Sequence, residues 1–526
     1  MLTRDPTPAL TDLDRQVFTL VVAENHYLRQ VAAHIDFERF RPRLVEAYSS
    51  GMGRPAIDPV RMLKVLFLRF HYKLSDRQVM ERTKTDMAFR CFLGFPLDYG
   101  VPNHTGGTYF RQRIGIDRFA QIFQELIAQA REAGLVKDRL RLKDATHMLA
   151  DVADVRPLQL AAQVRERLLR AAEPLFADWV AEQRVQIDTL RQTTAEFEDD
   201  ERLAARVEHL KTMAAKLREL LATLASTPQS QKEHARLHRA LELVDKLLAD
   251  RQPKAQDRLA SAIDPEARVG KHCGYFLGYL LDITIDPDSE IITAVNVLPG
   301  NGNEAADAST LIEQEEEAQG NDVAGLSMDG AGYNGPMLRD LTDPAGLNLD
   351  MTVPPPSPPE RPTFGPERFS LTIIDTQHGE LTCPNGQTTR QRSRTGKDTG
   401  YRYQFKTKQC SACPLRTECL TNPASNRGRM VIKNDYEKEY VKVAAKARTP
   451  EYEETRRTHP KIERKLGEVV RHHSGRRACF RGLPKVLTQA VLTALVVNVK
   501  RMVKLLRQPA PQALIAPAVR AALATS

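Results

Sequence analysis

The chain has 526 residues, of which 41% are hydrophobic and 27% are charged; this is ordinary for globular proteins and too long for a single hydrophobic core. No run of about 18 apolar residues is present, and the first residues lack the apolar segment of a signal peptide. Seven cysteines, an odd and small number, do not indicate a disulfide framework. We therefore expect a protein of several domains that stays in the cytoplasm and does not enter a membrane.

Residues 1–134 are predicted to form a helical domain. Asp58 followed by Pro59 is typical of a helix N-cap with proline at the first position, and the helix after it is apolar on most of its surface. Ser75 begins another amphipathic segment. Short helices around this turn resemble a helix-turn-helix that reads DNA, although plain helical packing explains them equally well. We interpret this region as a DNA-binding domain.

The next segment, residues 135–154, is predicted to contain a strand that carries a carboxylate. Leu142 and Asp144 alternate with Arg141 and Lys143, so Asp144 points to the same side of the strand as the leucine. A carboxylate on an apolar side must be paired, protonated or bound to a metal, because a bare buried charge is very unfavourable. Asp144 is therefore a candidate functional residue.

Residues 155–262 differ in character, being rich in Ala, Leu, Glu and Arg. Leucines and other apolar residues recur at steps of three or four from Leu203 to Leu224 and again from Leu237 to Leu248. The pattern predicts two or three long helices packed as a hairpin, inserted into the surrounding domain. A coiled-coil dimerisation arm would leave the same pattern, but internal packing is the favoured use.

A sheet is predicted to continue in residues 263–350. Two β-rich runs, Tyr275–Ile285 and Ile291–Leu298, flank a short polar turn and indicate a hairpin. A helix from about Ala305 leads to the stretch VAGLSMDGAGYNG, in which a strand ends at Asp329 before a glycine-rich turn and a helix. Strands and helices in this order predict a mixed sheet with helices on its faces.

Asp329 has two interpretations. A carboxylate at the end of a strand is exposed by the turn while the sheet fixes its backbone, which suits metal or acid–base chemistry. Asp before Gly is also a common turn pair, and Asp often caps the next helix. Taken alone, the stretch favours the cap by about two to one.

Residues 351–430 contain a proline-rich connector followed by four cysteines within 37 residues. These are Cys383, Cys410, Cys413 and Cys419. Four thiolates can bind Zn²⁺ tetrahedrally and stabilise a small segment with little core of its own. We expect a structural zinc site in preference to free thiols, by about two to one.

The end of the chain, residues 431–507, is predicted to be helical and basic. Between Arg456 and Arg507 there are 14 Lys and Arg against two acidic residues, an excess that indicates a polyanion such as nucleic acid or, equally, a solvated basic face. Glu463 lies in this basic context, where a surface salt bridge is its simplest role. Residues 508–526 are expected to be a flexible tail. The candidate DNA-binding residues are Arg268, Lys271, Arg464, Arg471, Arg476, Arg477 and Arg481.

Several stretches, taken in order, resemble bacterial insertion-sequence transposases of the DDE class. They are GRPAIDPVRMLKVLFLRFHYKLSDRQV, KDATHMLADV, DPEARVGKHCGYFLGYLLDI, SMDGAGYNG and IERKLGEVVRHHSGRRACFRGL. The resemblance implies an α-rich α/β fold with a ribonuclease-H-like catalytic domain, a mixed sheet with helices on both faces, interrupted by the helical and the cysteine-bearing insertions. It implies that Asp144, Asp329 and Glu463 are the three catalytic carboxylates, which bind two Mg²⁺ (or Mn²⁺) ions.

The resemblance also implies cleavage of DNA at transposon ends and strand transfer into target DNA. The partner would be double-stranded DNA, bound by a homodimer near the bacterial nucleoid. A transposon-derived DNA-binding protein without catalysis and a metal-dependent nuclease are the alternatives. Related transposases often carry Tyr seven residues before the glutamate, Arg four before and Lys seven after, where this chain has Arg456, His459 and Val470. Glu468 is therefore an alternative third acid.

Overall fold

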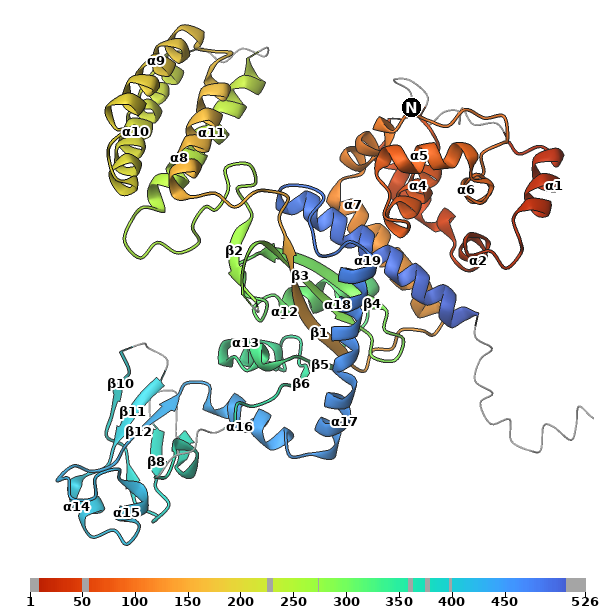
Figure 1. Cartoon of the computed structure of the whole chain (residues 1–526). Helices are drawn as coiled ribbons and strands as arrows, with labels where there is room; N and C mark the ends of the chain where they lie inside the picture. Colours follow the sequence, from red (N-terminus) through yellow and green to blue (C-terminus); the bar gives the residue numbers. More distant parts are fainter. Residues whose placement is uncertain are drawn as a thin grey trace, which may run out of the picture. The chain divides into compact units, whose positions relative to one another are not determined.

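The computed structural model describes residues 9–49, 56–224, 230–272, 274–357, 363–373, 379–396 and 400–507. The chain divides into two compact units, and Figure 1 labels most of their helices and strands. Unit 1 comprises Met1–Asp322 and Lys461–Ser526, and unit 2 comprises Val323–Pro460. The predicted tail, residues 508–526, lies outside the described residues.

The N-terminal part of unit 1 is helical, as predicted. Its elements are α1 (Asp12–Val21), α2 (Tyr27–His34), the 3₁₀ helix η1 (Phe37–Phe40), α3 (Arg41–Val45), α4 (Pro59–His71), α5 (Asp76–Thr85), α6 (Met87–Leu93) and α7 (Thr105–Glu132). Asp58 caps α4 by accepting from the backbone N–H of Val60 and of Arg61, and Ser75 caps α5. Both predicted helix starts are thus confirmed.

An antiparallel sheet forms the centre of unit 1. Its strands are β1 (Arg141–Leu149), β2 (Arg268–Lys271), β3 (Tyr275–Ile285) and β4 (Ile292–Pro299). β3 pairs with β1 along one edge and with β4 along the other, and its first residues pair with β2. The predicted hairpin is confirmed as β3 and β4. Asp144 on β1 lies opposite Ile283 on β3.

The two faces of this sheet are covered differently. The face of Leu142 belongs to the main hydrophobic core, which also includes residues of α18 (Pro460–His472, in unit 1 from Lys461) and α19 (Leu483–Leu506). The opposite face packs against α12 (Ala308–Gln319), where Arg141 and Lys143 are buried in ion pairs with Glu315 (2.5 Å) and Asp282 (2.8 Å). Helices therefore cover both faces of the sheet of unit 1, as expected.

α19 is the one described helix that is long and apolar enough to cross a membrane by length and composition. Its most apolar window is 83% buried inside the structure. It contacts α4, α7 and β4, so packing in the core of unit 1 accounts for its apolar surface.

The helical insertion contains four described helices where the sequence predicted two or three. They are α8 (Pro157–Ala172), α9 (Ala177–Thr193), α10 (Asp199–Thr223) and α11 (Gln231–Ala249). Shorter helices separated by turns replace the long hairpin. Leu210, Leu217, Leu237 and Val244 are fully buried in a core of the insertion's own, so the heptad-like residues serve internal packing.

Unit 2 begins with a parallel pair of short strands joined through a helix. β5 (Gly325–Ser327) pairs with β6 (Asp350–Thr352), and the 3₁₀ helix η2 (Gly330–Gly332) and α13 (Gly335–Leu341) lie between them in sequence. This is the predicted order of strand, glycine-rich turn and helix. Unit 2 ends with α16 (Glu437–Lys446) and α17 (Pro450–Thr458).

The cysteine-bearing segment of unit 2 forms two small antiparallel sheets, β7-β8-β9 and β10-β11-β12. Its elements are η3 (Pro366–Arg368), β7 (Ser370–Ile373), β8 (Gly379–Thr382), β9 (Thr388–Thr389), β10 (Arg392–Arg394), β11 (Gly400–Gln404), α14 (Thr407–Ser411), α15 (Arg416–Cys419) and β12 (Met430–Asn434). Five buried residues, Phe369, Leu381, Tyr403, Phe405 and Val431, form its core. Such a core is small for its length.

Candidate active site

Asp144 lies in the middle of β1 and is half-buried. Its Oδ1 accepts a hydrogen bond from the backbone N–H of Ala145 at 2.8 Å. The neighbouring Arg141 and Lys143 point to the opposite face, where buried ion pairs hold them. The strand that carries Asp144 is therefore fixed on both faces, and its carboxylate sits on the side of the main core, as the alternation predicted.

Glu463 lies in the first turn of α18 and is exposed. The same helix buries Ile462, Leu466 and Val469 in the core that receives the apolar face of β1. Asp144 and Glu463 thus belong to elements that pack into one core of unit 1. Among the described residues, Glu463 makes no ion pair, so the surface salt bridge that its sequence context suggested is absent there.

Glu468, the alternative third acid, is held in ion pairs, unlike Glu463. Its carboxylate pairs with Lys465 at 2.9 Å and with Lys500 on α19 at 3.0 Å. Burial would raise the pKa of Glu468, but the two lysines outweigh it and lower the pKa to about 2. Glu468 therefore joins α18 to α19, and Glu463 is the better candidate for chemistry.

Asp329 follows β5 in unit 2 and is exposed. Its Oδ1 accepts from the backbone N–H of Ala331 at 3.0 Å, so it caps the short turn η2. The next helix, α13, has its own cap, because Asn334 accepts from the N–H of Met337. Both interpretations of Asp329 hold in part: the residue caps a turn and also presents its carboxylate to solvent at the end of a strand.

Two residues of the α17 region hold the end of β5. His459 is buried, and its Nδ1 lies 3.1 Å from the hydroxyl of Ser327. Arg456 donates a hydrogen bond to the carbonyl oxygen of Met328 at 2.8 Å. Burial, followed by the charge of Arg456, lowers the pKa of His459 to about 4 although Asp329 opposes the shift, so the imidazole is neutral at pH 7.

The sequence identified these two positions only as departures from the family pattern. Their role depends on contacts across more than 120 residues of chain, which no local pattern encodes. Their spacing from Glu463 was the only available signal.

The glycine-rich turn after Asp329 packs closely against its surroundings. A Cβ atom at Gly335 would lie 2.4 Å from the ring of Tyr436, and one at Gly332 would lie 2.9 Å from Met328. At Gly330, by contrast, a Cβ atom would meet nothing within 4 Å. Steric fit therefore requires glycine at two of the three positions.

The predicted DNA-binding residues, all in unit 1, divide into two groups. Four are exposed and make no ion pair with a described residue: Lys271, Arg464, Arg471 and Arg477. The other three are bonded to neighbours within unit 1. These bonds join Arg268 to Asp257 at 2.5 Å, Arg476 to His147 at 2.6 Å, and Arg481 to Asp151 at 3.1 Å. Members of the first group are the better placed to contact phosphates.

The four predicted zinc ligands lie in one part of unit 2. Cys383, Cys410 and Cys419 pack against its small core, and the Sγ atom of Cys410 accepts from the N–H of Arg429 at 3.4 Å. Burial raises the pKa of Cys419; Arg429 opposes this, and the other three thiols raise it further. No group of three or more His, Cys, Asp or Glu side chains in the described part of the chain is arranged to hold a metal ion.

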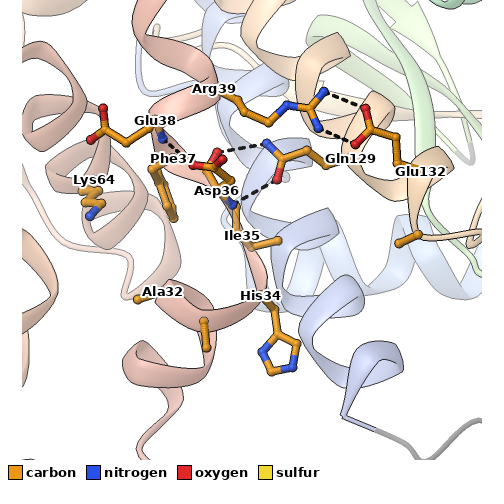
Figure 2. Close-up of a pocket in the computed structure, with 12 residues that line it drawn as sticks. Ala32, His34, Ile35, Asp36, Phe37, Glu38, Arg39, Lys64, Gln129 and Glu132 are labelled. Atoms are coloured by element: carbon orange, nitrogen blue, oxygen red, sulfur yellow. Dashed lines mark hydrogen bonds and ion pairs between the residues drawn. The ribbon is translucent and has the colours of Figure 1, made fainter.

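A separate pocket of about 590 Å³ lies in the N-terminal helices (Figure 2). Its polar groups bind one another: Asp36 exchanges two hydrogen bonds with Gln129, and Arg39 pairs with Glu132 at 2.5 Å. Lys64 lies over aromatic rings, and burial lowers its pKa. The pocket is lined by none of the predicted catalytic residues.

Two parts of the chain match the models of known protein families. Residues 17–113 match the family model of a transposase domain (DUF772), and residues 382–503 match that of the transposase DDE domain. The first range covers most of the N-terminal helices, and the second includes the four cysteines, Glu463 and most of α19. No curated protein and no solved structure gives a significant match.

Both matches support an insertion-sequence DDE transposase, the family that the sequence resembles. Proteins of this family bind DNA, cut it and generally use divalent metal ions. The α-rich mixed α/β fold agrees with that assignment. Asp144 and Asp329 lie outside both matched ranges, so their roles rest on the sequence motifs and on the geometry of each unit.

Proposed function

We propose that the protein is an active DDE transposase, which cleaves double-stranded DNA at the ends of its element and joins those ends to target DNA. Asp144, Asp329 and Glu463 are the catalytic carboxylates of this proposal. The observation that carries it is the contrast between two acids of one helix: Glu463 is exposed at the start of α18, whereas Glu468 is neutralised by two lysines.

The order of the strands supports a ribonuclease-H-like catalytic domain. Unit 1 contributes the antiparallel strands β1, β3 and β4, followed by α12, and unit 2 contributes the parallel strands β5 and β6. Asp144 lies on the first of these strands and Asp329 directly after the fourth, counted without the short β2. In sequence, the helical insertion interrupts this series between β1 and β3, and the cysteine-bearing insertion follows β6.

The donor set fits Mg²⁺ or Mn²⁺, because carboxylate oxygens are the ligands that these hard cations prefer. Two divalent ions, when bound, supply an activated oxygen nucleophile and stabilise the leaving 3′ oxygen. Asp144 and Glu463 come from unit 1 and Asp329 comes from unit 2. Each of the three residues would hold its carboxylate on a fixed backbone: Asp144 on strand β1, Glu463 on helix α18 and Asp329 at the capped turn η2.

Exposed cations would hold the DNA. Lys271, Arg464, Arg471 and Arg477 are available to contact phosphates, which position the duplex without reading its sequence. A homodimer on DNA follows from the need to handle two ends of one element, and action on the chromosome places the enzyme at the bacterial nucleoid.

The four cysteines would form a structural zinc site on binding the metal, since no three His, Cys, Asp or Glu side chains in the described part of the chain are arranged to hold an ion without it. The tight turn after Cys383, closed by a hydrogen bond from the N–H of Gly386 to its carbonyl oxygen, and the N–H donated to Cys410 are both typical of metal-bound thiolates. The segment has only a small core, so a metal would add needed stability. Metal analysis of native protein tests this: less than about half an equivalent of zinc per chain would exclude a four-thiolate site.

Strand transfer by purified protein tests the proposed function. Wild-type protein, Mg²⁺ and DNA bearing the element's ends should give cleaved and joined products. Asp144→Asn, Asp329→Asn and Glu463→Gln should each reduce product formation by at least about 100-fold while DNA binding persists. Glu453→Gln, which changes an exposed acid of α17, is the matched control.

Other outcomes of the strand-transfer assay would each indicate a different function or a wrong site assignment. End binding without cleavage by the wild-type protein would indicate a DNA-binding protein of transposon origin. Cleavage without joining would indicate a nuclease. Full joining activity in Asp144→Asn or Asp329→Asn would show that the assignment of the site is wrong.

A further inference from the structure

The cysteine-bearing segment is strongly basic. Residues 388–434 contain eleven Lys and Arg against two acidic residues, an excess of nine positive charges that equals the net charge of +9 of the whole chain. This excess is separate from the basic end of the chain, since it lies in a different part of the sequence. Such a concentration of charge in a small module indicates a polyanionic partner.

Strand alternation places part of this charge on one face. Tyr403 and Phe405 are buried in the small core, so Arg402, Gln404 and Lys406 project on the opposite side. Arg402 and Lys406 are both exposed, and four residues of extended chain separate them by about 13 Å.

Two further exposed cations lie near Lys406, outside the alternation of β11. The N–H of Phe405 donates to the carbonyl of Arg429, and the hydroxyl of Thr407 donates to the carbonyl of Asn426, so the pairing of β11 with β12 continues past both strands. Continued past both strands, the register places Gly428 opposite Lys406, with the exposed Arg427 next to it in the chain; the exposed Lys408 lies two residues after Lys406, at the start of α14. We call Arg402, Lys406, Lys408 and Arg427 the β11 cation strip.

The strip is not neutralised within the module. None of its four members makes an ion pair with any described residue, whereas Arg390 and Arg394 nearby pair with Glu380 and Asp435. Unpaired cations at this spacing suit an extended row of phosphates: one DNA strand presents about four phosphates over ~13 Å of axis.

We propose that the β11 cation strip binds the phosphate backbone of duplex DNA. This surface is additional to the DNA contacts predicted in unit 1. The proposal rests on the proposed function only because that function makes DNA the substrate. The contacts would be electrostatic, so they would strengthen binding without selecting a sequence.

Salt dependence of DNA binding by the full-length protein tests the strip. The triple variant Arg402→Gln, Lys406→Gln, Arg427→Gln removes three of its charges. Arg170→Gln, Lys211→Gln, Lys216→Gln removes the same charge from exposed positions of the helical insertion and is the matched control. Duplex DNA carrying an element end is titrated between about 50 and 200 mM salt, the range over which phosphate contacts change affinity strongly.

In the strip variant, the slope of log affinity against log salt should fall by about 2 to 3, and affinity at low salt should drop by at least about tenfold. The control should match the wild type. Acetylation of Lys406 and Lys408 in wild-type protein, with Lys211 as the reference lysine, gives a second measurement. DNA should protect Lys406 and Lys408 but not Lys211.

An unchanged slope in a folded strip variant, or equal acetylation with and without DNA, would overturn the proposal and leave an acidic protein as the partner to be sought. These outcomes are distinguishable from failure of the proposed function, because neither depends on cleavage. A catalytically silent wild-type protein would still show the change in slope.

Discussion

Arg456 donates a hydrogen bond to the carbonyl oxygen of Met328, the residue immediately before Asp329. Together with the contact between His459 and Ser327, this bond fastens α17 to the last residues of β5. The family pattern has other residues at these two positions, so this chain uses its departures from the pattern to fix the strand end that carries a candidate catalytic carboxylate.

Removing this bond should impair catalysis more than folding. Arg456→Gln loses the charged donor to the Met328 carbonyl, so Asp329 should be held less rigidly and the cleavage rate at saturating DNA should fall about 10- to 100-fold. The Mg²⁺ concentration needed for half-maximal rate should rise, which a general loss of stability would not cause. Arg456→Lys should restore part of the rate.

Arg457→Gln is the control for that experiment, because the side chain of Arg457 is 81% exposed and, among the described residues, pairs only with Glu453 of the same helix. Equal cleavage rates and equal Mg²⁺ requirements in Arg456→Gln and Arg457→Gln would contradict a positioning role.

The glycines after Asp329 should differ sharply in their tolerance of alanine. Gly335→Ala would place Cβ 2.4 Å from the ring of Tyr436, so the protein should lose about 1–3 kcal/mol of unfolding free energy as the two groups move apart. Gly330→Ala meets nothing within 4 Å and should stay within about 0.5 kcal/mol of the wild type. Urea unfolding of both variants checks the difference, and a similar loss in both would contradict the steric argument.

The buried ion pair between Lys143 on β1 and Asp282 on β3 should contribute to stability as a unit. Lys143→Met leaves the carboxyl of Asp282 buried without its partner, and should reduce the unfolding free energy by about 3–5 kcal/mol. Burial raises the pKa of Asp282, and the charge of Lys143 opposes this, so in the variant the pKa should rise further and the carboxyl should be protonated. Adding Asp282→Leu should restore most of the loss.

Urea unfolding of the single and double variants measures this coupling. The pair does not act as a unit if Asp282→Leu lowers the unfolding free energy of Lys143→Met by as much as it lowers that of the wild type.

Local sequence patterns are sufficient to predict much of the fold. The caps at Asp58 and Ser75, the hairpin of β3 and β4, and the strand that ends before Asp329 all depend on neighbours in sequence, and each was predicted from them. Both strand-borne aspartates were found because alternation and turn residues are local signals.

The remaining features depend on long-range contacts. The sequence could not show that Lys500, 32 residues away, would bind Glu468, or that His459 would contact Ser327. Nor could it show that β11 and the two residues after it would turn Arg402 and Lys406 outward, since the apolar runs there are too short for a clear period. The sequence pattern indicates the helical insertion but not its turns, so it predicts two or three helices where the described residues form four.

The pH dependence of stability distinguishes the two acids of α18. The folded pKa of Glu468 is lowered to about 2 from an ordinary value of 4.5, so its ion pairs contribute stability above pH 4.5, and that contribution is lost as the pH falls towards 2. Glu468→Gln should therefore be less stable than the wild type by about 2 kcal/mol at pH 7, and the gap should close near pH 2. Glu463→Gln, an exposed residue outside any described ion pair, should lose strand transfer with no comparable change in stability at either pH. Urea unfolding of both variants at pH 7 and pH 3 gives the comparison, and a gap for Glu468→Gln that is the same at the two pH values would mean that its ion pairs are not the source of the stability.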